Sequence, residues 1–411
     1  MIEKTIGKKI DNKKNYLAIM ISIIVNNFGD VLFDLFIVWN ITNSSGDIMN
    51  AVYLLGSSIL FRAVIALFIG ILVDRIDKKK LIILSNISSA LIIVCFACSY
   101  SYILQHIGLG IFFILLNDIN NEVFGRSYLV MASELFSQEV FIKFRAGCTI
   151  INRVVVIAGS SIVGFLVALI PDKAIFLIDI VAFMISAGCI GLVRYKHMAP
   201  PQEAQRSIGS ILKDLRGDLG RMFSEMTTNP FIKKFIVIMF ILNLAYGYIP
   251  EILPVKIADD LSSAVILGMI RSFMAIGEIL GLAVVSRKGS QVSRLFKISM
   301  IGNALCMLSL AFTQNSYGIL LIFFLYGFLD SITQPLFSYT VTMIDEADRG
   351  KIMGGIDTVI LLSPSIGMYL FARLMHFHKF AGYIGVAGVF IVAFLIVLFS
   401  RELNRIVVKS E

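Results

Sequence analysis

Acidic side chains recur inside the most apolar stretches of this sequence of 411 residues. Asp30 and Asp34 are four residues apart in one stretch, and Asp118 and Glu122 are four residues apart in another. Because residues four apart share one face of an α-helix, each pair points in one direction. A charged side chain inside a membrane is costly unless it faces protein or water, so these four acids are candidate functional groups.

Carboxyl groups that share a partly desolvated cavity can bind and release a proton near neutral pH, and they also attract cations. We therefore expect Asp30 to be the main proton-coupling group, ahead of Asp118, Asp34 and Glu122. The structural alternative is an ion pair between Asp30 and Arg62 on adjacent helices. The same cavity would be lined by the amide side chains of Asn26 and Asn121.

Three charged residues of the second half are candidates for the same cavity. Arg271 and Glu278 are seven residues apart and would share one helix face. Asp330 lies at the position equivalent to Asp118, at an offset of about 212 residues that relates the two halves. Such internal duplication, with binding at the interface of the repeats, is a feature of secondary transporters.

Two further acids receive other interpretations. Glu251 falls at the outer end of its apolar run, where we expect it to be solvated. Asp179 falls in a run that we expect to be peripheral, and we expect it to pack against Arg153. Neither residue belongs to the predicted cavity.

The elements that would position these residues are apolar runs long enough to cross a bilayer as helices. The sequence is 57% hydrophobic and 16% charged, its mean hydropathy is +0.86, and soluble domains are roughly a quarter charged. We therefore predict an all-α membrane protein with 12 transmembrane helices in two pseudo-symmetric six-helix bundles. The runs are 16–40, 48–73, 81–103, 107–131, 146–170, 173–194, 232–253, 262–285, 293–313, 316–342, 352–374 and 380–400.

The polar segment between the sixth and seventh runs divides the chain. We predict an N-terminal bundle over residues 1–195, a cytoplasmic linker with an amphipathic helix over 196–230, and a C-terminal bundle over 231–411. The linker helix would carry apolar residues at helical spacing on one face and charges on the other, which suits a membrane surface.

Lysine and arginine concentrate in alternate connections, as cytoplasmic loops require. Together with a polar, lysine-rich N-terminus, this predicts a multi-pass protein of the cell membrane with both termini in the cytoplasm and no cleavable signal. The net charge of +8 then reflects topology and contact with the lipid bilayer, and no nucleic-acid partner is expected.

One connection carries a specific pattern, in which Gly70 is followed by Asp74, Arg75 and Lys78. The spacing resembles the signature loop of the major facilitator superfamily, although Asp77 stands where that loop usually has glycine. The resemblance implies that these four residues form a conformational latch on the cytoplasmic side. We expect the latch to be completed by Arg126 and Glu134.

The first apolar run contains Asn27-Phe28-Gly29-Asp30 and is followed by Thr42-Asn43-Ser44-Ser45. This is similar to the macrolide-efflux and enterobactin-exporter branch of drug:proton antiporters. The resemblance implies export of a small amphiphilic or cationic compound, such as a drug, macrolide or siderophore, driven by the proton motive force. The fifth run keeps glycines but lacks the Gly-Pro motif of antiporters, so an importer or a lipid-type facilitator on the same fold is the alternative.

Other classes of protein fit the sequence less well. A membrane-embedded enzyme would need a nucleophile and base or a metal motif such as H-E-x-x-H, and none is present. Phosphate-binding glycine loops are also absent, so we expect no cofactor and no resident metal. A sensor that does not transport is a further alternative. We expect a monomer whose partners are a small-molecule substrate and the bilayer.

Overall fold

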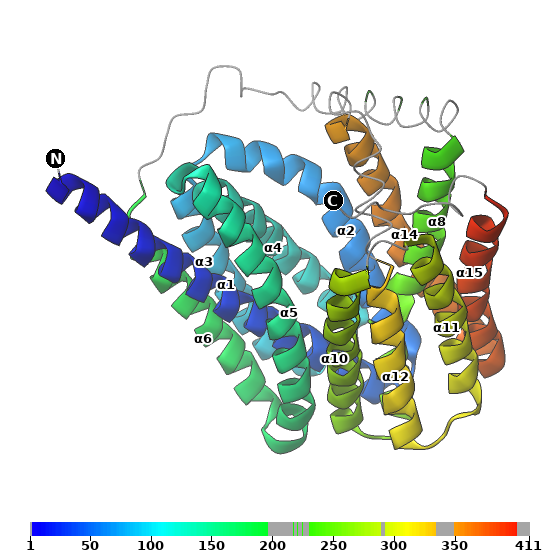
Figure 1. Ribbon diagram of the computed structural model, residues 1–411. Coiled ribbons are helices and arrows are strands. Elements are labelled where there is room, and N and C mark those ends of the chain that lie inside the picture. Colours follow the sequence, from blue (N-terminus) through cyan, green and yellow to red (C-terminus); the bar gives the residue numbers. More distant parts are fainter. Residues whose placement is uncertain are drawn as a thin grey trace. The chain divides into compact units, whose positions relative to one another are not determined.

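The computed structural model describes residues 2–195, 217, 220, 224, 230–288, 292–333 and 349–400. Within these ranges the chain forms helices and no strands. Figure 1 shows the order of the helices along the chain. The first six are α1 (Ile2–Ser45), α2 (Ile48–Arg75), α3 (Lys78–Ile103), α4 (Ile107–Leu135), α5 (Gln138–Leu169) and α6 (Asp172–Gly191). The others are α8 (Pro230–Tyr248), α9 (Leu253–Asp260), α10 (Ala264–Lys288), α11 (Val292–Phe312), α12 (Ser316–Ser331), α14 (Arg349–Phe377) and α15 (Lys379–Phe399).

Eleven stretches of the described helices are long and apolar enough to cross a membrane, and α12 is a shorter apolar helix. The predicted all-α membrane fold is therefore confirmed. Helix α12 ends at Ser331, and residues 334–342 of the tenth apolar run lie outside the described residues. The predicted linker helix of 196–230 lies almost wholly outside the described residues.

The stretch between the seventh and eighth apolar runs, which we expected to be a connection, forms the short helix α9. Pro254 stands at the start of α9, where its fixed φ favours a helix and its missing N–H costs nothing. Lys256 Nζ lies 2.7 Å from Asp260 Oδ1 and 3.8 Å from Asp259 Oδ2. Ion pairs at this spacing support a helix.

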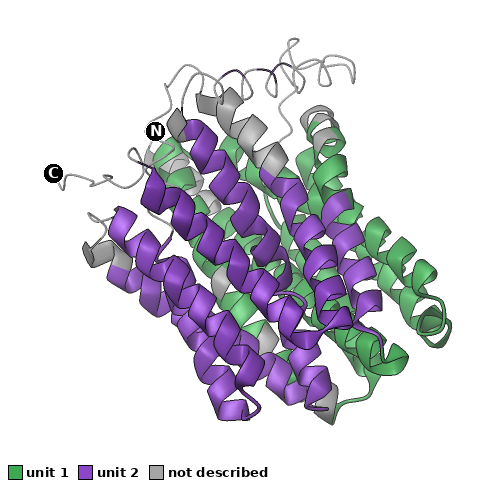
Figure 2. Cartoon of the chain, turned by 90° about the vertical axis from the view of Figure 1, so that its right-hand side faces the viewer, with its two compact units in different colours: residues 1–46, 61–208 green, residues 47–60, 209–411 purple. Residues whose placement is uncertain are grey.

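The chain divides into two compact units, coloured in Figure 2. The first unit comprises residues 1–46 and 61–208, and the second comprises 47–60 and 209–411. Helix α2 is therefore continuous but shared, because its first part belongs to the second unit. This differs from our expectation that residues 1–195 form one bundle. The boundaries of the linker stay a prediction.

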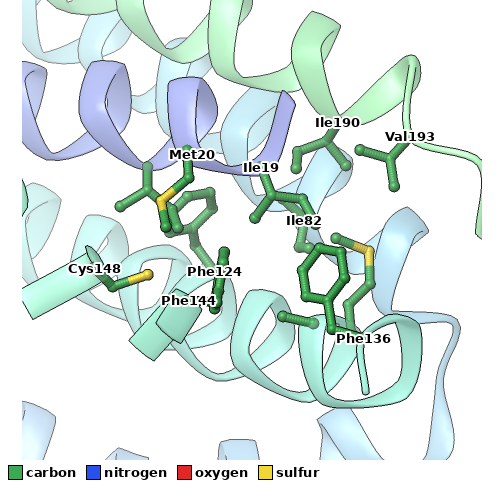
Figure 3. Close-up of a cluster of buried hydrophobic side chains, with 12 residues drawn as sticks. Ile19, Met20, Ile82, Phe124, Phe136, Phe144, Cys148, Ile190 and Val193 are labelled. Carbon is green, nitrogen blue, oxygen red and sulfur yellow. The ribbon is translucent and has the colours of Figure 1, made fainter. Parts of the chain in front are cut away.

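The first unit is held together at one end by a core to which five helices contribute. Figure 3 shows apolar side chains of α1, α3, α4, α5 and α6 gathered around buried aromatic rings. The edge of the Phe144 ring meets Tyr16, with 5.6 Å between the ring centroids. The buried members include Ile19, Met20, Ile82, Phe124, Phe136, Phe144, Cys148 and Ile190.

The second unit uses glycine to bring helix backbones together. A Cβ atom on Gly277 of α10 would overlap the carbonyl oxygen of Phe324 in α12, and one on Gly327 of α12 would overlap that of Met274. Helices α8 and α14 meet in the same way through Gly247 and Gly367. Small residues permit such close approach between membrane helices.

Helix α14 contains Pro364, which has no N–H to donate to the carbonyl of Ile360. The Ser363 hydroxyl donates to that carbonyl instead, at 2.7 Å, so the helix continues past the proline. Next to it, the buried Ser365 hydroxyl donates to the Gly56 carbonyl of α2 at 3.2 Å. This contact fastens the first part of α2 into the second unit.

The aspartate that departs from the signature loop has a structural role. Asp77 is the N-cap of α3, and its side chain accepts a hydrogen bond from the Lys80 backbone N–H at 3.2 Å. Aspartate is among the preferred N-cap residues because its oxygen satisfies one of the free N–H groups of the first turn. The substitution of aspartate for glycine therefore begins α3 rather than disturbing the turn.

Candidate functional site

The polar faces of α1 and α4 meet inside the first unit. Asn121 donates to Asp30 through Nδ2 and Oδ1 at 3.2 Å. Both side chains are half-buried, whereas Asp118, one turn from Asn121, is buried. The sequence prediction that the two faces form one site therefore agrees with this contact, and Asp30 receives its hydrogen bond from a neutral amide.

The arginines of this region gather on Glu122. Arg62 Nε lies 3.3 Å from Glu122 Oε1, and Arg126 Nε lies 3.4 Å from Oε2 of the same carboxylate. The alternative in which Arg62 forms an ion pair with Asp30 is therefore not observed, because Arg62 pairs with Glu122. Arg126 likewise pairs within its own helix instead of with Glu134 of the latch. The physical reason is the i,i+4 spacing of Glu122 and Arg126, which places them side by side.

The other acids act on these groups through space. Asp118, Glu122 and Asp34 all contribute to the electrostatic field at Arg62, and Asp118 and Arg62 contribute to that at Asp30. Asp34 is exposed, so the acidic cluster retains an accessible side. We call this group of side chains the α1–α4 acid cluster, and it has more carboxylates than cations. Its members are Asp30, Asp34, Asp118, Glu122, Arg62 and Arg126.

Asn26 does not join this cluster. Its Nδ2 donates to Asn86 Oδ1 of α3 at 3.1 Å, and both side chains are buried. Asn86 Nδ2 in turn donates to the carbonyl of Ile82. The Asn26 amide is thus bonded to α3, and its role in lining the cavity stays a prediction.

The predicted site residues of the second unit lie on α10 and α12. Arg271 Nη2 is 3.0 Å from Glu251 Oε2 and 3.3 Å from the Glu251 carbonyl oxygen. Glu251 is thus an ion-pair partner of Arg271, and its side chain is also 39% exposed, in keeping with the expectation that it is solvated. Glu278 and Asp330 are half-buried, and both act electrostatically on the buried Tyr326.

The structure describes part of the predicted latch. Lys78 is 3% exposed, and its Nζ lies 3.7 Å from Glu134 Oε1. Gly70 leaves room beside Arg126, whose Nη1 would lie 3.8 Å from an added Cβ. The side chains of Asp74 and Arg75 lie outside the described part of the chain.

Among the described residues, no group of three or more histidine, cysteine or acidic side chains is placed to hold a metal ion.

A model of the Major Facilitator Superfamily matches residues 15–344. The chain belongs to the Major Facilitator Superfamily. This membership identifies a membrane transporter of small molecules and not an enzyme. None of the curated proteins matches the sequence.

Solved structures of other transporters share this fold. A POT family transporter in complex with a thioalcohol-conjugated peptide is 14% identical with a TM-score of 0.71, over 95% of this chain and 96% of that chain. The nucleoside transporter NupG is 14% identical with a TM-score of 0.68, over 93% and 97%. The human organic anion transporter MFSD10 (TETRAN) is 14% identical with a TM-score of 0.63, over 94% and 99%. Likeness at this identity shows the fold alone.

Sequence reasoning missed one residue that matters in this major facilitator, Tyr195, and gave another, Asp179, a different environment. Tyr195, which follows the end of α6, donates its hydroxyl hydrogen to Glu134 Oε2 and so joins the predicted latch. Asp179 of α6 is buried, and the acids that act on it are Asp30 and Asp34 of α1. A charge in a run expected to be peripheral was the signal for Asp179, whereas nothing in the sequence pattern marks Tyr195.

Proposed function

We propose that this major facilitator exchanges protons for a small cationic or amphiphilic compound and exports that compound by alternating access. The observation that carries the proposal is the α1–α4 acid cluster. In this cluster Glu122 forms ion pairs with both arginines, Arg62 and Arg126. Asp30 accepts its hydrogen bond from the neutral Asn121. The cluster therefore keeps negative charge that a proton or a cation would balance.

The exchange follows from competition for the same carboxylates. A proton on Asp30 or a cation beside it each removes one unfavourable negative charge from a partly desolvated site. Binding of one then weakens binding of the other, and this mutual exclusion is what an antiporter needs. A proton gradient directed inward would favour protonation from outside and release inside, and the compound would move the other way.

Buried hydrogen bonds of other α1 residues hold this helix in place, which supports a role for Asp30 in binding rather than in packing. Its helix is anchored elsewhere, because Asn26 is held by Asn86 and the Ser22 hydroxyl lies 2.7 Å from that of Ser186. Loss of the Asp30 charge should therefore leave α1 in place. A substitution at Asp30 can test function without removing a structural support.

The test uses inverted membrane vesicles that contain the protein and are energised so that the lumen is acidic. Addition of a lipophilic cation, tetraphenylphosphonium, or of a macrolide should partly collapse the pH gradient, and D30N should abolish the response. The control E139Q removes an exposed carboxylate of the first unit, whose partner is Lys143, and should leave the response intact.

Each result decides one part of the proposal. No response to any compound, with the protein present in the membrane, would contradict exchange of protons for cations. A response that D30N leaves unchanged would reject Asp30 as the coupling group. Substrate uptake driven by an acidic exterior in right-side-out vesicles would reverse the proposed direction and favour the importer.

A further inference from the structure

Asp179 lies in the middle of α6, yet it is 1% exposed. Neither carboxyl oxygen has a hydrogen-bond partner among the described residues. Buried side-chain polar atoms nearly always have such a partner, so two bare oxygens on one carboxyl group require an explanation. Asp179 is not part of the α1–α4 acid cluster defined above.

Helix α1 provides the groups that face Asp179. A Cβ atom on Gly29 would overlap Asp179 Oδ1, so the carboxyl group occupies space that only a glycine at position 29 leaves open. The charged groups that act on Asp179 are Asp30 and Asp34, which both follow Gly29 on α1. Every charge that α1 presents to Asp179 is therefore negative.

The other helices packed against α6 are α3 and α5. Helix α3 has no ionisable residue from Leu81 to Val94, the stretch that includes the buried Ser89 and Ile93. On α5, Arg153 is the ionisable residue of the apolar middle, and its side chain lies outside the described part of the chain. The described surroundings of Asp179 thus offer neither a donor nor a positive charge.

An ionised carboxylate in such surroundings would be desolvated, without donors and repelled by two acids. Burial of an isolated charge costs far more than burial of a neutral polar group. A carboxylic acid removes both the charge and the repulsion. The geometry therefore favours a proton on Asp179 while Asp30 and Asp34 carry negative charge.

We propose that Asp179 is a second proton-binding site of this transporter, occupied in the conformation described here. This inference rests on the proposed function for its role in transport. When a cation neutralises Asp30 and Asp34, the repulsion that holds the proton falls. The O–H bond of Asp179 then breaks, the proton passes to water, and a carboxylate remains. Cation binding would thereby release a proton from α6.

Infrared spectroscopy of the purified full chain in lipid nanodiscs tests whether the proton is present. A carboxylic acid absorbs above the amide I band, and a carboxylate does not. The wild type should show this band at neutral pH without any substrate, and D179N should lack it. G29A, which adds a Cβ against the carboxyl group, should shift its frequency.

The matched variants separate the possible results. Loss of the band in D30N with retention in D179N would overturn the proposal. So would a wild-type spectrum without the band, as expected if Arg153 pairs with an ionised Asp179. The asparagine is isosteric, so D179N should keep the thermal stability of the wild type, and a cooperative melting curve confirms that it folds.

Proton release on addition of tetraphenylphosphonium, measured with a pH indicator in weak buffer, tests the role in transport. The wild type should release protons, and D179N should release fewer. If the band is present but the cation releases no proton, the proposed exchange fails while Asp179 stands as a proton-binding site. If D179N releases as many protons as the wild type, Asp179 has no part in the exchange.

Discussion

Replacement of Gly367 by alanine should prevent the second unit from folding stably, although the change adds a single methyl group. The new Cβ would overlap the Leu244 carbonyl oxygen of α8, and the atoms nearest to it are backbone. A side chain can rotate away from such an overlap, but a helix backbone can only move as a whole. Overpacking costs about 1–3 kcal/mol where neighbours yield. We expect a loss above that range at Gly367.

The intrinsic helix preference of alanine would by itself stabilise the variant, so a loss of stability can be assigned to the overlap. Alanine is favoured over glycine by about 1 kcal/mol inside a helix. At Gly388 of α15, a Cβ would meet nothing within 4 Å, so G388A should be neutral or slightly stabilising. Melting curves of the two variants in detergent, read by size-exclusion chromatography, should therefore move apart. Equal melting temperatures would show that α8 and α14 do not pack this closely.

Replacement of Glu134 by leucine should destabilise the first unit by roughly 2–3 kcal/mol. The Glu134 carboxylate forms an ion pair with Lys78, which is 3% exposed, and accepts a hydrogen bond from the Tyr195 hydroxyl. Removal of one partner from a buried ion pair costs about 3–5 kcal/mol, and we reduce this figure because Glu134 is itself 24% exposed. Unfolding of the purified protein in detergent would report the loss.

Two further variants divide this loss between its causes. Y195F removes one hydrogen bond and should cost about 1 kcal/mol. The double variant K78M/E134L replaces the charges by apolar groups and should recover most of the stability. Burial raises the pKa of Tyr195, and its hydrogen bond to Glu134 raises that pKa further. The phenol is therefore protonated at neutral pH, and its contribution disappears only at strongly alkaline pH. A double variant no more stable than E134L would reject the ion pair as the cause.

The helices were predictable because long apolar runs bounded by charges have one solution in a bilayer. The loop at Gly70 and Asp74 predicted the superfamily, since its residues recur at fixed spacing. Periodicity also predicted that Asp30 and Asn121 would meet, because each lies on the polar face of its own helix. These are local patterns, and the sequence displays them directly.

The partners of the charged residues were harder to predict. Arg62 pairs with Glu122 and not with Asp30, although both acids lie on the polar faces of their helices. Glu251 and Arg271 pair across the short helix α9, which hydropathy treats as a loop. Helix rotation and tertiary contacts decide such pairs, and spacing along one helix carries no information about either.

The shared helix α2 also has a consequence for how the chain is made. The Gly56 carbonyl and the Ser365 hydroxyl that bind each other are 309 residues apart. At a synthesis rate of about 5–20 residues per second, roughly 15–60 s pass between the emergence of the two groups. During that interval, the first part of α2 is in the membrane without the helix against which it will pack. The second unit therefore cannot be completed from residues 209–411 alone, and separately produced halves should assemble only if the first part of α2 is protected until α14 is made.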